Sequence, residues 1–128
     1  MSVTIFTAIG LGAACGAWLR WALGEWLNPL GFAFPLGTLA VNLGGGFLMG
    51  VTLAVLQANP GLSPALRLGL TTGLLGGLTT FSTFSAEAFN LAQRGAWGWM
   101  GAHMALHAIG SILMTWAGYG LTQTWRGL

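Results

Sequence analysis

Apolar residues run along this chain in stretches of about twenty, and short segments containing Pro, Gly and Asn separate them. A transmembrane helix needs about 20 predominantly apolar residues to cross a hydrocarbon core about 30 Å thick. The pattern therefore predicts an all-α membrane protein. Its four membrane-spanning helices form a single transmembrane domain over residues 1–128, at about 3–23, 36–57, 65–93 and 96–124.

The third span is longer than one crossing requires, and its middle is poor material for a continuous helix. Residues 73–85 begin with three glycines in five positions, followed by a run of hydroxyl residues and two phenylalanines. Glycine costs about 1 kcal/mol per helical site, and hydroxyl side chains compete for backbone hydrogen bonds. We expect this helix to break mid-membrane. The stretch is either an ion or substrate site at a break or a glycine-rich packing face whose hydroxyls bond back to their own helix.

The fourth span carries a periodic row of polar residues. His103, His107, Ser111 and Thr115 are four residues apart, so they share one face of a helix. At 1.5 Å rise per residue the row is about 18 Å long, which indicates the wall of a narrow polar pathway. Two histidines on one helix, with few other ligand residues in the chain, do not favour a haem or metal site.

Three more polar residues fall in or near the apolar spans. Asn42 is costly in hydrocarbon unless it is paired, so it faces either a pore or a hydrogen-bonding partner on another helix. Glu87 is a functional candidate, because carboxylates are rare within membrane segments, or it is a plain charge at a helix end. Arg20 lies between aromatic residues near the end of the first span, which is typical of an interfacial anchor.

Composition narrows the function classes. The chain has 128 residues, of which 55% are hydrophobic and 5% charged, whereas soluble domains average about 25% charged residues. A soluble fold is therefore excluded. The charges show no basic patch for nucleic acid, and the single Cys15 supports no disulfide framework. The N-terminus has no basic leader, so we expect the first helix to be retained. No catalytic nucleophile, pair of general acid–base residues or nucleotide-binding loop is recognisable, so we do not expect an enzyme.

The arginines give no preferred orientation in the membrane. With four crossings, two of the four arginines fall on each side of the membrane, so the positive-inside rule predicts no orientation. A chain of this kind can insert both ways, and we expect an antiparallel, dual-topology homodimer. Broken helices that cross at its axis would place carbonyl oxygens around a small cation such as Na⁺.

One motif resembles a known family. Residues 76–87 read GGLTTFSTFSAE, which is similar to the signature of the Fluc (CrcB) family of bacterial fluoride channels. The resemblance covers nearly the whole chain, including the Trp18–Trp21 stretch, Gly37-Thr38, Val41-Asn42 and the 107–115 region. It implies passive export of F⁻ across the bacterial inner membrane by an antiparallel homodimer. This dimer has two pores and a central structural Na⁺.

The resemblance also implies roles for individual residues. The backbone carbonyls of Gly76 and Thr79 would hold Na⁺, and the positive ring edges of Phe81 and Phe84 would face the anion. The other expected pore and vestibule residues are Asn42, Ser82, Thr83, Ser111, Thr115, Glu87, Thr38, Arg20 and His107. Donors from Asn42, Ser82 and Thr83 would replace the water of fluoride, while a narrow pore excludes chloride.

Two rival interpretations remain. A proton-coupled exporter of the small multidrug resistance type also has four helices per chain. It would have to use Glu87, because the first span carries no carboxylate before Glu25. A scaffold subunit of a larger complex is the other alternative. It predicts that Asn42, Phe81 and Phe84 tolerate apolar substitutions with no effect on transport.

Overall fold

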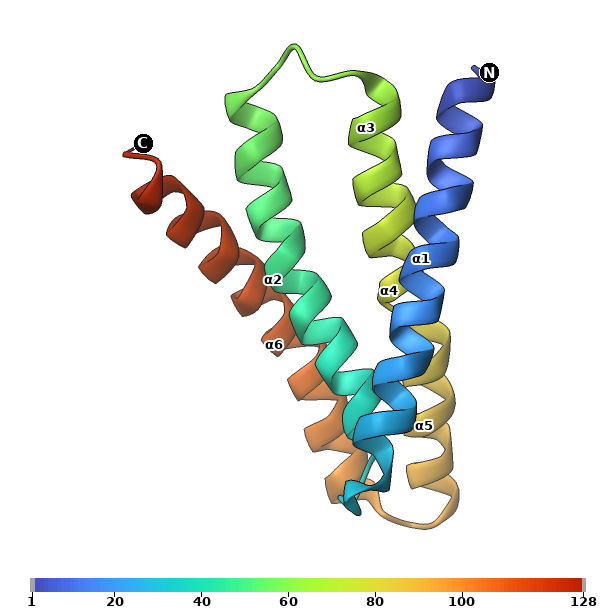
Figure 1. The fold of residues 1–128 in the computed structure, drawn as a ribbon. Helices are drawn as coiled ribbons and strands as arrows, with labels where there is room; N and C mark the ends of the chain where they lie inside the picture. The colour runs from blue at the N-terminus through green and yellow to red at the C-terminus, as the bar shows by residue number, and fades with distance from the viewer. Residues whose placement is uncertain (1, 128) are drawn as a thin grey trace.

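The computed structural model describes residues 2–127, and all regular structure in that range is helical. The elements are α1 (Val3–Leu27), η1 (Asn28–Leu30), α2 (Leu36–Ala58), α3 (Pro64–Leu68), η2 (Gly69–Leu75), α4 (Gly76–Leu78), α5 (Phe81–Gln93) and α6 (Trp97–Trp125). The predicted all-α class is confirmed. Both termini lie at one end of the molecule with the α2–α3 connection, and the α1–α2 and α5–α6 connections lie at the other (Figure 1).

The helix boundaries differ from the predicted spans mainly at the first helix and in the third span. The predicted end of the first helix at residue 23 is wrong: α1 continues through Gly24 to Leu27. It ends where Pro29 follows, because proline lacks the N–H that a helix needs. The second and fourth predicted spans agree with α2 and α6 to within one residue at each end. The third is divided among α3, η2, α4 and α5.

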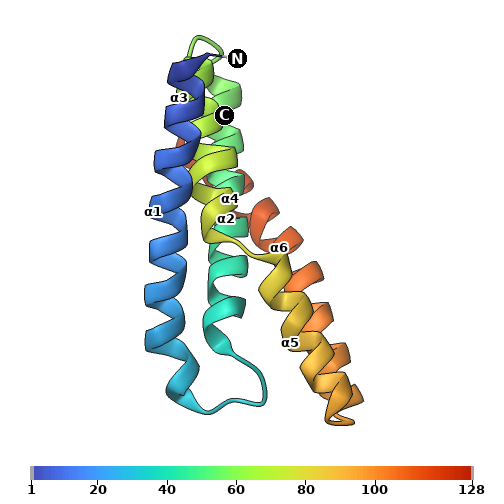
Figure 2. The same cartoon turned by 90° about the vertical axis from the view of Figure 1, so that its right-hand side faces the viewer.

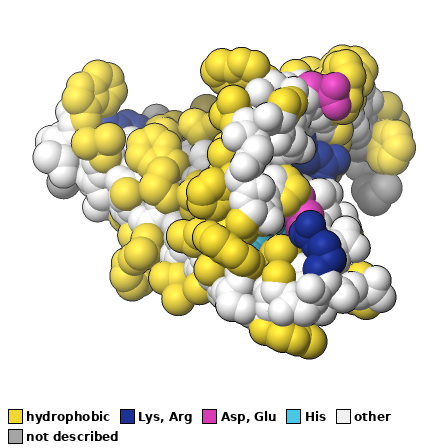
Figure 3. Space-filling model, turned by 90° about the horizontal axis from the view of Figure 1, so that it is seen from below, with side chains coloured by type: hydrophobic (Ala, Val, Ile, Leu, Met, Phe, Trp, Pro, Cys, Tyr) yellow, Lys and Arg dark blue, Asp and Glu magenta, His cyan; other side chains and the backbone are white. Residues whose placement is uncertain are grey.

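The exterior of the molecule is strongly apolar. Phe6, Ile109 and Trp116 are 68%, 59% and 71% exposed, and apolar side chains cover much of the face in Figure 3. Two helical stretches, Val3–Leu30 and Leu36–Ala58, are long and apolar enough to span a membrane. A surface of this kind is suited to lipid or to another protein rather than to water. These features support a membrane protein, while the count of four spans remains a prediction.

Glycines allow the helices to approach each other closely. A Cβ at Gly16 of α1 would lie 2.6 Å from the backbone nitrogen of Leu78, and one at Gly50 of α2 would lie 2.7 Å from that of Tyr119. Small residues at such crossings let backbones meet in membrane bundles. Gly12 and Gly16 have the small-xxx-small spacing in the sequence that allows such a close approach. This approach brings α1 against the segment that leads into the motif.

Replacing Gly16 with alanine is expected to lower the free energy of unfolding by about 1–3 kcal/mol, as overpacking does in well-packed cores. The added methyl would collide with backbone atoms near Leu78, which cannot rotate away. Tryptophan fluorescence during unfolding in mixed micelles measures the change. Gly10→Ala on the same helix is the matched control, because a Cβ there meets no atom within 4 Å. Equal stability of the two variants would contradict this packing.

The helical conformation is interrupted between α4 and α5. Thr79 (φ −80°, ψ 155°) and Thr80 (φ −148°, ψ 118°) are extended, and α5 sets off from there in a new direction (Figure 2). The Thr80 hydroxyl accepts a hydrogen bond of 3.2 Å from the backbone N–H of Thr83, which caps the start of α5. The interruption lies within the predicted third span. Its mid-membrane depth remains a prediction.

Candidate functional site

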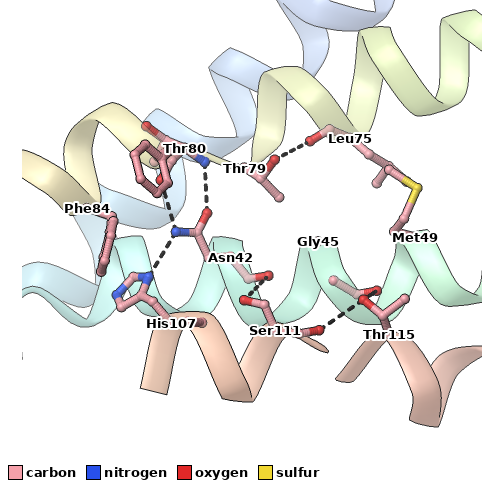
Figure 4. Close-up of a pocket in the computed structure, with 13 residues that line it drawn as sticks. Asn42, Gly45, Met49, Leu75, Thr79, Thr80, Phe84, His107, Ser111 and Thr115 are labelled. Atoms are coloured by element: carbon pink, nitrogen blue, oxygen red, sulfur yellow. Dashed lines mark hydrogen bonds between the residues drawn. The ribbon is translucent and has the colours of Figure 1, made fainter. Parts of the chain in front are cut away.

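A cavity of about 360 Å³ lies between α2, α6 and the interruption at Thr79 and Thr80. It is lined by Asn42, Gly45, Gly46, Met49, Leu75, Thr79, Thr80, Phe81, Phe84, His107, Ala108, Ser111 and Thr115. Most of the residues in Figure 4 come from segments far apart in the sequence. The fold thus brings together predicted pore residues from the second, third and fourth spans.

Asn42 joins α2 to the interruption and to α6 (Figure 4). Its Oδ1 accepts a hydrogen bond of 2.8 Å from the backbone N–H of Thr80. Its Nδ2 donates to the Thr80 carbonyl at 3.0 Å and contacts Nδ1 of His107 at 2.9 Å. Because the Thr80 N–H fixes which end of the amide is oxygen, Nδ2 is the donor to His107. In this arrangement both amide hydrogens of Asn42 are engaged, so the side chain holds the site together as well as lining it.

The polar row on α6 is present as the spacing predicts, and its residues from His107 to Thr115 contact α2, whereas His103 contacts α5. The Ser111 hydroxyl lies 3.4 Å from the carbonyl oxygen of Asn42, and that of Thr115 lies 3.0 Å from the carbonyl of Gly46. Sequence reasoning ended the row at Thr115. The same four-residue spacing continues to Tyr119, whose hydroxyl donates to Gln57 Oε1 at 2.5 Å. The row therefore reaches further toward the other end of the molecule than predicted.

The two phenylalanines of the motif lie one turn apart on α5. Their ring centroids are 5.4 Å apart. Phe84 stacks on His103 at 5.2 Å and contacts His107 at 4.9 Å. Phe81 is 79% exposed in the single chain, although it also lines the cavity. Phe84 is therefore packed into the site, whereas the ring of Phe81 is available to whatever lies outside the chain.

Glu87 makes contacts with two other helices. Its Oε1 accepts a hydrogen bond of 2.5 Å from the Thr38 hydroxyl of α2, and its Oε2 lies 3.4 Å from Nε2 of His103 on α6. The His103 side chain is fully buried and that of Glu87 is 11% exposed. The alternative of a plain charge at a helix end is therefore wrong, because α5 continues to Gln93 and Glu87 points inward to these partners.

Three of the remaining predicted residues line a second cavity. This cavity of about 300 Å³ lies by the C-terminal end of α1 and the N-terminal end of α2, and its lining includes Arg20, Thr38, Thr80 and Thr83. The Nη1 of Arg20 donates to the carbonyl of Thr79 at 3.4 Å. Ser82 lines neither cavity, and its hydroxyl lies 3.4 Å from that of Thr80. Most of the predicted pore residues thus line one of two cavities that share Thr80, while Ser82 and Glu87 line neither.

Thr80 is the site residue that sequence reasoning missed. It binds Asn42 through both backbone polar groups and caps α5 through its hydroxyl. The Thr-x-x-Thr spacing of Thr80 and Thr83 resembles an N-cap and could have indicated this role. The neighbouring hydroxyl residues of the motif offer competing choices, so spacing alone did not single Thr80 out.

Known proteins resemble this chain over most of its length. The family described as "CrcB-like protein, Camphor Resistance (CrcB)" matches residues 7–119. A protein of Aromatoleum aromaticum named "Fluoride-specific ion channel FluC" is 62% identical over 122 residues, which is 95% of this chain and 93% of that protein. Proteins of the same name from Thiobacillus denitrificans and Pseudomonas putida are 52% and 58% identical over 91% and 87% of the chain, and over 94% and 87% of their own lengths. The resemblance to the CrcB family is confirmed, and this chain belongs to it.

Proposed function

We propose that this chain is a fluoride-selective channel that passively exports F⁻ across the bacterial inner membrane. The observation that carries the proposal is the cavity at the interruption, where Asn42, Phe84 and the α6 row meet. Relatives of up to 62% identity are named fluoride-specific ion channels. Ion channels are not enzymes, and the cavity requires no catalytic chemistry.

The lining of the cavity suits a small, strongly hydrated anion. Fluoride must exchange its water for donors and positive dipoles, and a pore selects by its width and by the strength of these groups. The positive ring edges of Phe81 and Phe84 supply such dipoles. The hydroxyls of Ser111 and Thr115 line the cavity and here donate to α2 carbonyls, so each would have to rotate in order to donate to the anion. Because the interior of a cell is electrically negative, such a pore releases the anion without a coupled energy source.

We place the interruption at mid-membrane and a second, antiparallel copy across it. The normal helical partner of the Gly76 carbonyl is the Thr80 N–H, which instead binds Asn42. The Thr79 carbonyl precedes extended backbone, and only the long 3.4 Å contact with Arg20 reaches it. Two freed carbonyls from each copy fit a bound Na⁺, which prefers oxygen ligands. These oxygens would hold it, and the charge would tie the two copies together. Two pores per dimer then follow from symmetry.

Fluoride efflux from liposomes that contain the purified protein tests this function. Valinomycin starts the efflux by releasing K⁺, and selective electrodes follow fluoride and chloride separately. Fast release of fluoride with little release of chloride is expected. Well-folded protein that releases neither anion, or both equally, would overturn the proposal.

Glu87→Gln is expected to keep most of the passive fluoride efflux, with a loss of less than about tenfold. Glutamine still offers an oxygen to the Thr38 hydroxyl, and exchanging a charged acceptor for a neutral one weakens a hydrogen bond by about 1 kcal/mol. The exporter alternative rests on the buried contact between Glu87 and His103. It predicts that efflux stops in this variant and in wild-type protein treated with a protonophore. Efflux of fluoride in both conditions would exclude it.

A further inference from the structure

Glu87, His103 and His107 form a cluster between α5 and α6, which we call the His–Glu cluster. One potential ligand atom from each side chain lies within 4.8 Å of the other two. Among residues 2–127, the buried side-chain atoms without a hydrogen-bond partner are Glu87 Oε2, His103 Nδ1 and His107 Nε2. Buried polar atoms nearly always have partners. Three orphaned atoms on three adjacent side chains therefore indicate a ligand that joins them.

We propose that the His–Glu cluster binds a divalent transition-metal ion such as Zn²⁺ beside the fluoride path. Imidazole nitrogens and a carboxylate oxygen are ligands that Zn²⁺ prefers. Sequence reasoning disfavoured a metal because the two histidines lie on one helix, but the fold supplies Glu87 from α5 as the third ligand. This inference goes beyond the transport of fluoride, because it assigns a cation site that transport does not require.

The dimensions of the cluster suit the ion after a small adjustment. Zinc lies about 2.1 Å from nitrogen and oxygen ligands, which places ligands in a tetrahedral site about 3.4 Å apart. One ligand atom of each side chain lies within 4.8 Å of the other two, so a shift of about 1 Å in each side chain would bring them to this spacing. Two neutral imidazoles and one carboxylate leave a net charge of +1 with Zn²⁺. They also leave a fourth position for water or an anion.

Neighbouring groups determine the tautomer of His103 and the orientation of the Glu87 carboxylate, two of the three potential ligands. The Nε2 of His103 lies 3.4 Å from the carbonyl oxygen of Phe84, which can accept a hydrogen bond only from a protonated Nε2, so that Nδ1 keeps its lone pair for a ligand. Thr38 donates to Oε1 of Glu87, whereas Oε2, 3.4 Å from Nε2 of His103, has no hydrogen-bond partner. Such outer contacts orient metal ligands and fix the histidine tautomer in known sites.

His107 couples the cluster to the fluoride path. Its Nδ1 accepts from Asn42 at 2.9 Å, so the proton of the neutral ring is on Nε2. A metal that takes Nε2 requires this proton to move to Nδ1, where it would face the amide hydrogens of Asn42. Occupation of the cluster therefore opposes the Asn42–His107 hydrogen bond at the cavity. Bound Zn²⁺ is expected to slow fluoride efflux.

Equilibrium dialysis of the full, tag-free chain in detergent against Zn²⁺ tests the site. One Zn²⁺ per chain is expected. Glu87→Gln and His103→Phe each remove a ligand, and each should weaken binding at least about tenfold, as loss of even an outer contact does. Glu25→Gln is the matched control, because it removes the other carboxylate of the chain and should leave binding unchanged. Size-exclusion chromatography confirms that each variant is folded.

The outcomes separate this site from the proposed function, since dialysis needs no fluoride. Absence of saturable binding to the wild-type chain, or binding undiminished in both ligand variants, overturns the metal site. Zn²⁺ added to proteoliposomes should also slow fluoride efflux by about tenfold at saturation, and EDTA should restore it. Saturable binding with unaltered efflux would show that the metal lies outside the fluoride path.

Discussion

Asn42→Leu is expected to reduce fluoride efflux by about 10–100-fold, because the amide holds Thr80 and His107 in place at the cavity, and each buried group left unpaired costs about 1–3 kcal/mol. Leucine is similar in volume but donates no hydrogen bond. The substitution leaves the backbone N–H and carbonyl of Thr80 without their partners. Proteoliposomes with a fluoride electrode measure the loss.

The same substitution should also destabilise the interruption between α4 and α5. Each buried backbone group left unpaired costs about 1–3 kcal/mol, so the free energy of unfolding should fall by about 2–6 kcal/mol. Asn42→Asp separates the two effects. It keeps an oxygen for the Thr80 N–H but loses the donor to the Thr80 carbonyl and to His107, so stability is partly retained while efflux is not.

Asn90→Leu is the control for this change of residue type. Asn90 lies on α5 and is exposed, so both stability and efflux should be close to those of the wild-type protein. Wild-type efflux from Asn42→Leu would contradict the role of Asn42 in the pore. Wild-type stability of that variant would contradict the contacts with Thr80.

The sequence predicts features that depend on local spacing. The row from His103 to Thr115 follows from helical periodicity alone, and α6 places it on one face as expected. The close approach at Gly16 follows likewise from the spacing of small residues. Both features belong to single helices whose apolar length was evident. Such features follow directly from the sequence pattern, because helical geometry alone sets which residues share a face.

Features that depend on contacts between distant segments were not predictable in the same way. Asn42 was a candidate, but its partner Thr80 is 38 residues away, and several polar residues of the motif could have met it. Glu87 and His103 were both candidates, yet nothing in their spacing indicates the 3.4 Å contact between them. The contact decides the chemistry, since it converts two isolated side chains into one cluster. Packing of whole helices determines such pairs, and local propensity does not.

Phe81→Ile tests whether the aromatic ring itself acts on the anion. Fluoride efflux is expected to fall by up to about tenfold, since polarised ring contacts contribute up to about 1.5 kcal/mol. Isoleucine remains apolar but has no positive ring edge. Phe81 is 79% exposed in the single chain, so the substitution should have little effect on the fold of the chain.

Phe89→Ile is the matched control, because Phe89 lies on the same helix and is 60% exposed but does not line the cavity. Its efflux should equal that of the wild-type protein. A scaffold subunit predicts no change in transport for either variant. A common loss in both would indicate that the substitutions act through assembly or the lipid contact. Loss confined to Phe81→Ile, with dimers and unfolding unchanged, requires a ring that faces the transported ion, because the two substitutions are otherwise chemically the same.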